Sequence, residues 1–448
     1  MTKTQSNQAS TTRSMKPFFT IWIGQIFSLL GSELVQFALV WWLTKTTGSA
    51  TVLALAAMMA VLPRVLISPI AGALVDRWNR RVVMILADGL IALAVIVLAV
   101  LFALDEVQVW QVYALMFIRA TGAAFHWPAM QASTTLMVPE KHLARIAGLN
   151  QALLGMASIA APLLAALLLE VLSLQAILMI DVLTAVLAIT PLLFIFVPQP
   201  ERAETTEQTP KPSITTDLIE ALRYLKAWPG LLMVLVIATV VNLLAFPAMS
   251  LQPLLVTEHF AGGALQLAWL QATVGIGMVA GGITLSVWGG FKRRVVTGLL
   301  ALGLSGIGFA VVGVVPANAL PLAIGAMLLA WFMNAIANGS LFAALQAIVP
   351  ADMQGRVFTL LQSGAGAMVP LGLAIAGPLA SALGVQFWFL AAGLTIAVMG
   401  FGGLLIPTIL HIEDDTPETN KTSVIEKTSS SSEKSAAPVT ASLNKEAA

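Results

Sequence analysis

Two charged residues stand deep inside long apolar runs of this chain, where a charge is costly. Glu33 lies in the middle of the run from Phe18 to Leu43, and Arg119 lies in a later run. A charge at mid-bilayer depth costs about 2.5–3.5 kcal/mol on insertion scales, so it usually has a function or a neutralising partner. Both residues lie about ten residues from the same end of their runs, which places them at similar depth. We interpret the two as a proton- or cation-coupling pair; the alternative is a static ion pair that fixes helix packing.

Further charged residues lie in neighbouring apolar runs. Arg64 and Asp88 fall in the same half of their runs, and their matching depth predicts a structural or gating ion pair; the alternative is a coupling site. Asp181 lies about two turns inside another run, and it is either a second titratable site or a residue in water near the membrane surface. His126 is isolated, and a lone histidine is more often packed or hydrogen-bonded than a proton relay.

These residues must be positioned by membrane-spanning helices. Of the 448 residues, 58% are hydrophobic and 10% are charged, and the mean hydropathy is +0.89. Soluble domains carry about 25% charged residues, so this chain cannot form a water-soluble shell. About 20 apolar residues span a bilayer, and helices satisfy their own backbone there. The sequence predicts an all-α membrane protein with twelve transmembrane helices in two pseudo-symmetric six-helix bundles, with spans at 17–43, 51–73, 82–103, 110–137, 145–169, 174–197, 230–256, 265–288, 295–315, 319–346, 357–382 and 386–409.

The distribution of lysine and arginine predicts the orientation. The loops on one side hold most of these cations, whereas the other side holds Lys45 among the acids Asp105, Glu106, Glu170 and Glu258. Because cations mark the cytoplasmic side, we expect a multi-pass protein of the inner or plasma membrane with both termini in the cytoplasm. The predicted divisions are a cytoplasmic tail (1–16), a six-helix bundle (17–197), a cytoplasmic linker (198–229), a second six-helix bundle (230–410) and a disordered cytoplasmic tail (411–448).

The two halves of the chain repeat one another. Matching positions recur at an offset of about two hundred residues, which is typical of transporters built from parallel repeats. Segment 138–146 matches 349–357, Gln151 matches Gln362, and segment 76–81 matches 289–294. In that plan the substrate binds between the halves, near the middle of the membrane.

Two segments carry a resemblance to a known family. Segment 72–81, Gly-Ala-Leu-Val-Asp-Arg-Trp-Asn-Arg-Arg, resembles the signature loop of the major facilitator superfamily. Segment 119–122, Arg-Ala-Thr-Gly, resembles the arginine motif of its proton-driven antiporters. More narrowly, four stretches are similar to the macrolide efflux pumps of the drug:proton antiporter branch: 19–25, 47–50, 117–119 with 124–129, and 355–358. That branch also exports other drugs and siderophores.

The resemblance implies a role for the signature loop. In the family this loop latches the two halves together on the cytoplasmic side while the outer side is open. The positions that match are Asp76, Arg77, Arg80 and Arg81. The arginines also set topology, but acids contribute little to it, so topology does not explain Asp76. In the second copy Gly289 replaces this acid, which weakens any latch there.

The C-terminal half holds no acid or base deep in a span, so we expect charge coupling in the N-terminal half and a substrate wall in the C-terminal half. For any single amide, an interhelical hydrogen bond worth about 0.6 kcal/mol is the simpler role. The residues we predict to line the substrate cavity are Gln36, Asn242, Trp331, Asn334 and Asn338.

These features together predict a secondary active transporter that exports amphipathic, macrolide-type compounds by proton antiport with alternating access. One alternative is an exporter of a native metabolite such as a siderophore or lipid. A polytopic membrane enzyme or sensor is the other, and we find no polar catalytic cluster for it. The chain has no cysteine and no Walker A pattern, which argues against thiol chemistry and direct ATP drive. We expect a monomer in lipid whose partners are a small molecule and protons, with no cofactor, metal or nucleic acid.

Overall fold

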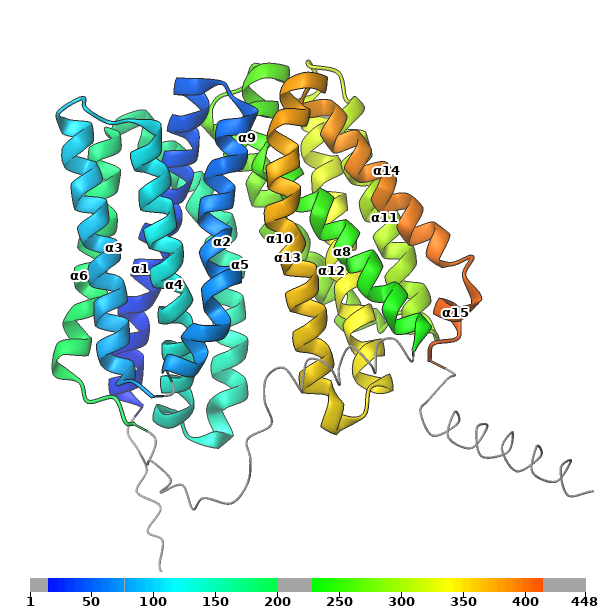
Figure 1. Ribbon diagram of the computed structural model, residues 1–448, viewed down its shortest axis with the longest axis horizontal. Coiled ribbons are helices and arrows are strands. Elements are labelled where there is room, and N and C mark those ends of the chain that lie inside the picture. The colour runs from blue at the N-terminus through cyan, green and yellow to red at the C-terminus, as the bar shows by residue number, and fades with distance from the viewer. Residues whose placement is uncertain (1–14, 76, 200–227, 414–448) are drawn as a thin grey trace, which may run out of the picture.

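The computed structural model describes residues 15–75, 77–199 and 228–413, and these residues are almost entirely helical (Figure 1). Within them, twelve helices have 19 residues or more. The helices of the first half are α1 (Lys16–Thr47), α2 (Ala50–Val75), α3 (Arg80–Ala103), α4 (Val109–Met137), α5 (Glu140–Val171) and α6 (Leu174–Phe194). Those of the second half are α8 (Pro229–Ser250), α10 (Ala264–Trp288), α11 (Arg294–Val314), α12 (Leu320–Ile348), α13 (Ala351–Leu383) and α14 (Val385–Gly403). The predicted all-α, twelve-helix fold is confirmed.

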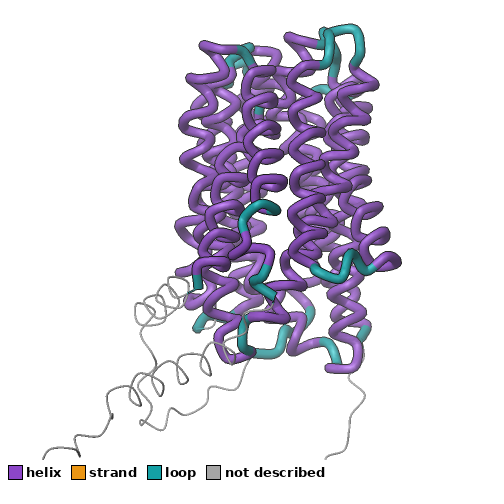
Figure 2. The backbone as a smooth tube through the Cα atoms, turned by 90° about the vertical axis from the view of Figure 1, so that its right-hand side faces the viewer, coloured by secondary structure: helices purple, strands orange, loops and turns teal. Residues whose placement is uncertain are grey.

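Eleven of these helices are long and apolar enough to cross a membrane. The remaining one, α4, is 29 residues long, but its polar residues, Arg119 and His126 among them, lower its hydropathy. Three short elements complete the described chain: α9 (Gln252–Leu254), the π-helix η1 (Leu255–His259) and α15 (Pro407–Leu410). Figure 2 shows the long helices running side by side over the height of the molecule, without a strand in the described residues.

The long helices form two six-helix bundles with the same internal packing (Figure 1). In the first bundle α1 packs on α5 and α6, α3 packs on α4 and α6, and α2 packs on α4. In the second bundle α8 packs on α13 and α14, α11 packs on α12 and α14, and α10 packs on α12. Each pair in one bundle therefore has a counterpart in the other, as a parallel repeat requires.

The closest helix pair lies in the second bundle, where α11 and α14 bring their backbones together. Gly306 lies against Ala397, Gly393 against Ala310, and Gly400 against the backbone of Gly303. A methyl group at Gly306, Gly393 or Gly400 would overlap the neighbouring backbone. Small residues allow this kind of approach between helices in lipid, where packing replaces the hydrophobic effect as the driving force.

The two bundles meet through α2 with α13 and through α5 with α10. We call the end at which α1 begins and α6 ends the terminal face, and the opposite end the distal face; in Figure 1 the terminal face is at the bottom. At the distal face, Thr51 Oγ1 of α2 lies 3.5 Å from Ser381 Oγ of α13. Nearer the middle, Gly275 of α10 packs against Ser158 and Ile159 of α5.

Toward the terminal face, polar side chains of both bundles are exposed. Gln151 of α5 and Gln362 of α13 are exposed at equivalent depths, and Asn338 of α12 is exposed as well. Polar residues within membrane spans face the protein interior or a water-filled cavity rather than lipid. We infer from these exposed groups a cleft between the bundles that is open toward the terminal face, whereas the bundles are in contact at the distal face.

Three of the predicted divisions of the chain lie mainly outside the described residues: the N-terminal tail (1–16), the linker (198–229) and the C-terminal tail (411–448).

Candidate functional site

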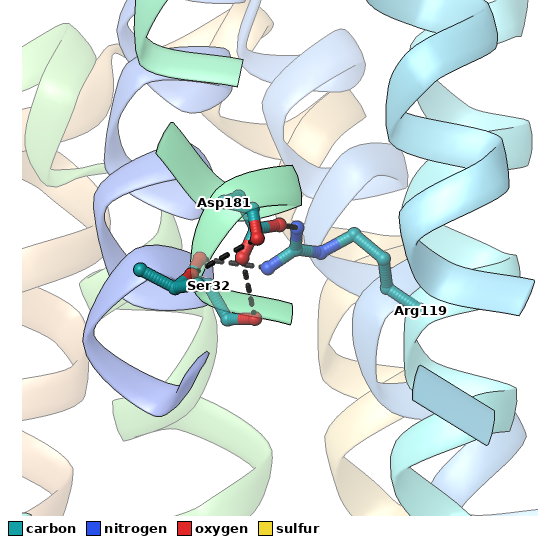
Figure 3. A network of polar contacts seen from close by, with 4 residues as sticks. Ser32, Arg119 and Asp181 are labelled. Atoms are coloured by element: carbon teal, nitrogen blue, oxygen red, sulfur yellow. Dashed lines mark hydrogen bonds and ion pairs between the residues drawn. The ribbon is translucent and has the colours of Figure 1, made fainter. Parts of the chain in front are cut away.

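The first bundle is crossed by a buried ion pair between α4 and α6. Arg119 Nη1 lies 2.8 Å from Asp181 Oδ2, and the two side chains are only 11% and 3% exposed. Arg119 Nη2 donates to the backbone carbonyl of Ser32 on α1 at 2.7 Å, while Ser32 Oγ donates to Asp181 Oδ1 at 3.1 Å (Figure 3). Three helices thus share one network in which both carboxylate oxygens of Asp181 accept a hydrogen bond.

A glycine on α1 makes room for this network. Gly31 packs directly against α6, where an added methyl group would overlap Thr184 Oγ1 and would lie 3.1 Å from Asp181 Oδ1. Thr184 Oγ1 also donates to the backbone carbonyl of Asp181 at 2.9 Å. The close approach of α1 to α6 is what brings Ser32 within hydrogen-bonding distance of the acid.

Glu33 has a different environment from its neighbour Ser32. Consecutive helical residues point about 100° apart, so when Ser32 faces α6, Glu33 faces away from the network. Its side chain is accessible in mid-span although protein surrounds it on most sides, as expected for a wall of the cleft. Arg119 and Arg64 are the cations close enough to act on it electrostatically. In the described part of the chain, Glu33 makes no side-chain hydrogen bond or ion pair.

The expected contact between Glu33 and Arg119 is therefore replaced by a pair between Arg119 and Asp181. The depth of the three residues is as predicted, but depth along a helix does not define the direction in which a side chain points. The charge of Arg119 acts on Glu33 electrostatically, but no hydrogen bond joins the two side chains. Asp181, one of whose predicted roles was a second titratable site, is the direct partner of the arginine.

The expected pair between Arg64 and Asp88 is not formed either. Asp88 of α3 is buried and accepts a hydrogen bond from Gln25 Nε2 of α1 at 3.1 Å, and His126 Nε2 of α4 lies 3.5 Å from its other carboxylate oxygen. Arg64 is exposed. The reason is that α2 packs chiefly on α4 and α13 rather than on α3, the helix that carries Asp88.

Two arginines of the signature loop, Arg80 and Arg81, donate hydrogen bonds to backbone carbonyls of the first bundle. Arg77 is exposed, and Asp76 lies outside the described residues. Arg80 Nη1 donates to the carbonyl of Ala132 on α4 at 2.8 Å. Arg81 donates to the carbonyls of Leu192 and Leu193, in the last turn of α6, where a cation also complements the helix dipole.

The second bundle repeats one of these bonds. Arg294, the first residue of α11, donates from Nη1 to the carbonyl of Ala343 on α12 at 3.1 Å. Arg80 is likewise the first residue of α3 and bonds to the equivalent place on α4. These two arginines therefore fix the third helix of each bundle to the fourth.

The residues predicted to line the cavity divide into two groups. Gln36, Asn242 and Asn334 are half-buried, and Asn338 is exposed and donates to the carbonyl and the side-chain oxygen of Asn334. Asn242 donates to Ala238 within its own helix.

Trp331 is half-buried as well, and it packs against neighbouring helices of its own bundle. Its ring forms an edge contact with Phe309 of α11, its Cβ lies against Gly277 of α10, and its indole nitrogen is buried.

Three polar residues of these networks were missing from the predicted site: Gln25, Ser32 and Thr184. A signal for two of them is present in the sequence. Gln25 and Ser32 are seven residues apart, which places them on one helical face, and Arg119 and His126 have the same spacing on α4. No equivalent pattern marks Thr184. No group of three histidine or acidic side chains suited to a metal ion occurs in the described ranges.

The sequence of residues 21–366 matches the profile of the Major Facilitator Superfamily. The chain belongs to this superfamily. This facilitator is 33% identical to Macrolide efflux protein A of Streptococcus pyogenes, over 85% of its own length and 93% of that protein. It is 26% identical to Multidrug efflux pump Tap of Mycolicibacterium fortuitum, over 89% and 97% of the two chains.

Solved structures agree with the fold of this facilitator. A bacterial homologue of the human lysosomal transporter Spinster, in an inward-facing and unoccupied conformation, superposes with a TM-score of 0.65. The alignment covers 89% of this chain and 97% of that one at 14% identity, a level that supports the fold alone. The facilitator is thus a multi-pass membrane transporter, and not an enzyme.

Proposed function

We propose that this facilitator exports amphipathic, macrolide-type compounds from the cell in exchange for protons, by alternating access of two bundles at residues 17–197 and 230–410. The relatives named for macrolide and multidrug efflux support this substrate class. Glu33 is the residue that we assign to proton coupling. The single observation that carries the assignment is its accessible, unpaired carboxylate in the cleft wall at mid-membrane depth.

The charge balance of the first bundle supports this role. Its mid-span acids are Glu33, Asp88 and Asp181, and its mid-span cations are Arg64 and Arg119, so with a neutral His126 the set carries one net negative charge. Asp181 and Arg119 already neutralise one another at 2.8 Å. While His126 is neutral, binding one proton at Glu33 would bring the whole set to neutrality, which lowers the free energy of a charge held in a low-dielectric region.

The distribution of charge supports a cytoplasmic opening of the cleft. The terminal face carries Arg77, Lys141, Arg145, Lys292 and Arg294, whereas the distal face carries acids such as Asp105 and Glu258. By the positive-inside rule the terminal face is cytoplasmic, with both termini in the cytoplasm, and the described cleft is open to the cytoplasm.

The substrate enters the cleft from the cytoplasm while Glu33 is ionised. After the bundles rock, an external proton neutralises Glu33 and favours return of the empty carrier as a monomer in lipid.

The test is transport of a radiolabelled macrolide and of a cationic dye into everted membrane vesicles energised by a proton gradient. We expect a protonophore added midway to stop net accumulation of both compounds. Accumulation that continues after the gradient collapses would contradict proton antiport. A metabolite panel in the same vesicles addresses the alternative cargo: robust transport of a siderophore or lipid, with no macrolide transport, would overturn the proposed substrate class.

A further inference from the structure

The buried polar groups of the first bundle form two layers at different depths. The distal layer contains Ser32, Arg119 and Asp181. The second layer contains Gln25, Asp88 and His126 and lies nearer the terminal face. Ser32 and Gln25 are seven residues apart on α1, as are Arg119 and His126 on α4, so the layers are separated by about two helical turns, or about 10 Å.

The second layer is incompletely hydrogen-bonded. One carboxylate oxygen of Asp88 accepts from Gln25 at 3.1 Å, and the other lies 3.5 Å from His126 Nε2. His126 Nε2 is buried and makes no hydrogen bond in the described structure. A buried polar atom without a partner destabilises the folded state, and a group in that condition calls for an explanation. A proton on Nε2 would be directed at the carboxylate and would convert the contact into a charge-assisted pair.

Apolar packing separates this layer from the distal one on the α3–α4 side. Ile91, one turn beyond Asp88 on α3, fills the space beside Gly122, which lies midway between Arg119 and His126 on α4. Direct exchange of a proton between the layers is therefore obstructed there. The imidazole keeps 18% of its side-chain surface accessible against 8% for Asp88, so the histidine is the more accessible end of the pair.

We propose that Asp88 and His126 form a second proton-binding site, in which His126 binds a proton and holds it on Nε2 against the Asp88 carboxylate. This inference rests on the proposed function, because the site would act as a cytoplasmic-side proton store for the antiporter. The other mid-span charges on α4 and on the helices packed against α3 and α4 are Glu33 of α1, Arg64 of α2, Arg119 of α4 and Asp181 of α6. Of these, Arg119 and Asp181 are bound to each other, whereas Glu33 lies in the cleft wall and Arg64 is exposed.

In the proposed site the proton on His126 is held by the charge of Asp88, so the two residues are coupled. Gln25 fixes the orientation of the carboxylate and carries no proton at any pH. Replacement of either member of the pair removes the same proton, and replacement of both removes no more than one of them. A merely structural Asp88 would leave the protonation of His126 unchanged.

The experiment is a potentiometric difference titration of the purified full chain in detergent, between about pH 5 and pH 8, where imidazoles titrate. We expect His126→Gln, Asp88→Asn and the double variant each to bind about one proton fewer per molecule than the unmodified protein. Asp88→Glu should retain that proton. Exposed His411→Gln and exposed Asp105→Asn, in other parts of the fold, are control variants carried through the same titration.

Each outcome bears on the proposal. An unchanged titration for His126→Gln overturns it, since the imidazole then binds no proton. A proton lost in His126→Gln but kept in Asp88→Asn also overturns the shared site. Gel filtration excludes misfolded variants, and Asp88→Glu provides a folded comparison if Asp88→Asn aggregates. The titration needs no transport activity: if the shared proton is found while a protonophore leaves macrolide transport intact, the site stands and the antiport mechanism fails.

Discussion

Arg119 Nη1 lies 2.8 Å from Asp181 Oδ2, and this pair, not a pair with Glu33, neutralises the arginine of α4. Its second terminal nitrogen is engaged by the carbonyl of Ser32. The guanidinium is therefore fixed in place by α1 and α6. Glu33 stays within the field of a positive charge without being bound to it, which leaves its carboxylate free to exchange a proton.

Replacement of Glu33 by glutamine should abolish proton-driven accumulation of a macrolide in everted vesicles while protein yield and macrolide binding stay close to normal. The amide has the same shape but cannot ionise, so only the coupling is lost. Glu106→Gln, at an exposed acid of the α3–α4 connection, is the matched control and should transport normally. Uphill transport by Glu33→Gln would place the coupling at another residue.

Removal of one member of the buried ion pair between Arg119 and Asp181 should lower the thermal stability more than removal of both. Asp181→Asn leaves the arginine buried without a counter-ion, a change that typically costs about 3–5 kcal/mol. Arg119→Gln combined with Asp181→Asn removes both charges and should recover much of that loss. The measurement is the thermal unfolding midpoint in detergent. Equal midpoints for the single and double variants would show that the two charges are not coupled.

Gly31→Ala should destabilise the first bundle and impair transport, because the methyl group would overlap Thr184 Oγ1 and push α1 away from α6. Combination with Thr184→Ala creates space and should restore part of the unfolding midpoint. Gly89→Ala is the control, since nothing lies within 4 Å of a methyl group there, and alanine is favoured over glycine within a helix by about 1 kcal/mol. A Gly31→Ala protein as stable as Gly89→Ala would contradict the close packing of α1 and α6.

A disulfide across the distal face should lock the described conformation. Thr51→Cys with Ser381→Cys places two thiols where the hydroxyl oxygens lie 3.5 Å apart, and the chain has no other cysteine to interfere. Oxidation should cross-link this pair and stop transport until a reductant is added. The pair Gln151→Cys with Gln362→Cys, on the open side of the cleft, should remain reduced in the resting protein. Efficient cross-linking of the second pair alone would mean that the resting cleft opens at the distal face.

The sequence was sufficient to predict the helices and the depth of each buried charge. Hydropathy and length identify a span because lipid allows few alternatives to a helix. The pairing of the charges was not predictable in the same way. Ser32 and Glu33 are adjacent in the chain, so their side chains face different directions. Only the packing of α1 on α6 decides which of them reaches Asp181. Arg64 was misassigned for the same reason, since the neighbours of α2 are not evident from its own sequence.

The backbone contact between α11 and α14 limits which positions of this chain can change during evolution. Positions such as Gly306 and Gly393 lie where any side chain would collide with the opposite helix. We therefore expect almost every substitution there to prevent folding and to be removed by selection. Variants that survive must therefore change elsewhere, and the cleft-facing amides of α12, such as Asn334 and Asn338, are free of that constraint. We expect natural variation in cargo preference to accumulate on α12, with the α11–α14 contact inherited almost unaltered.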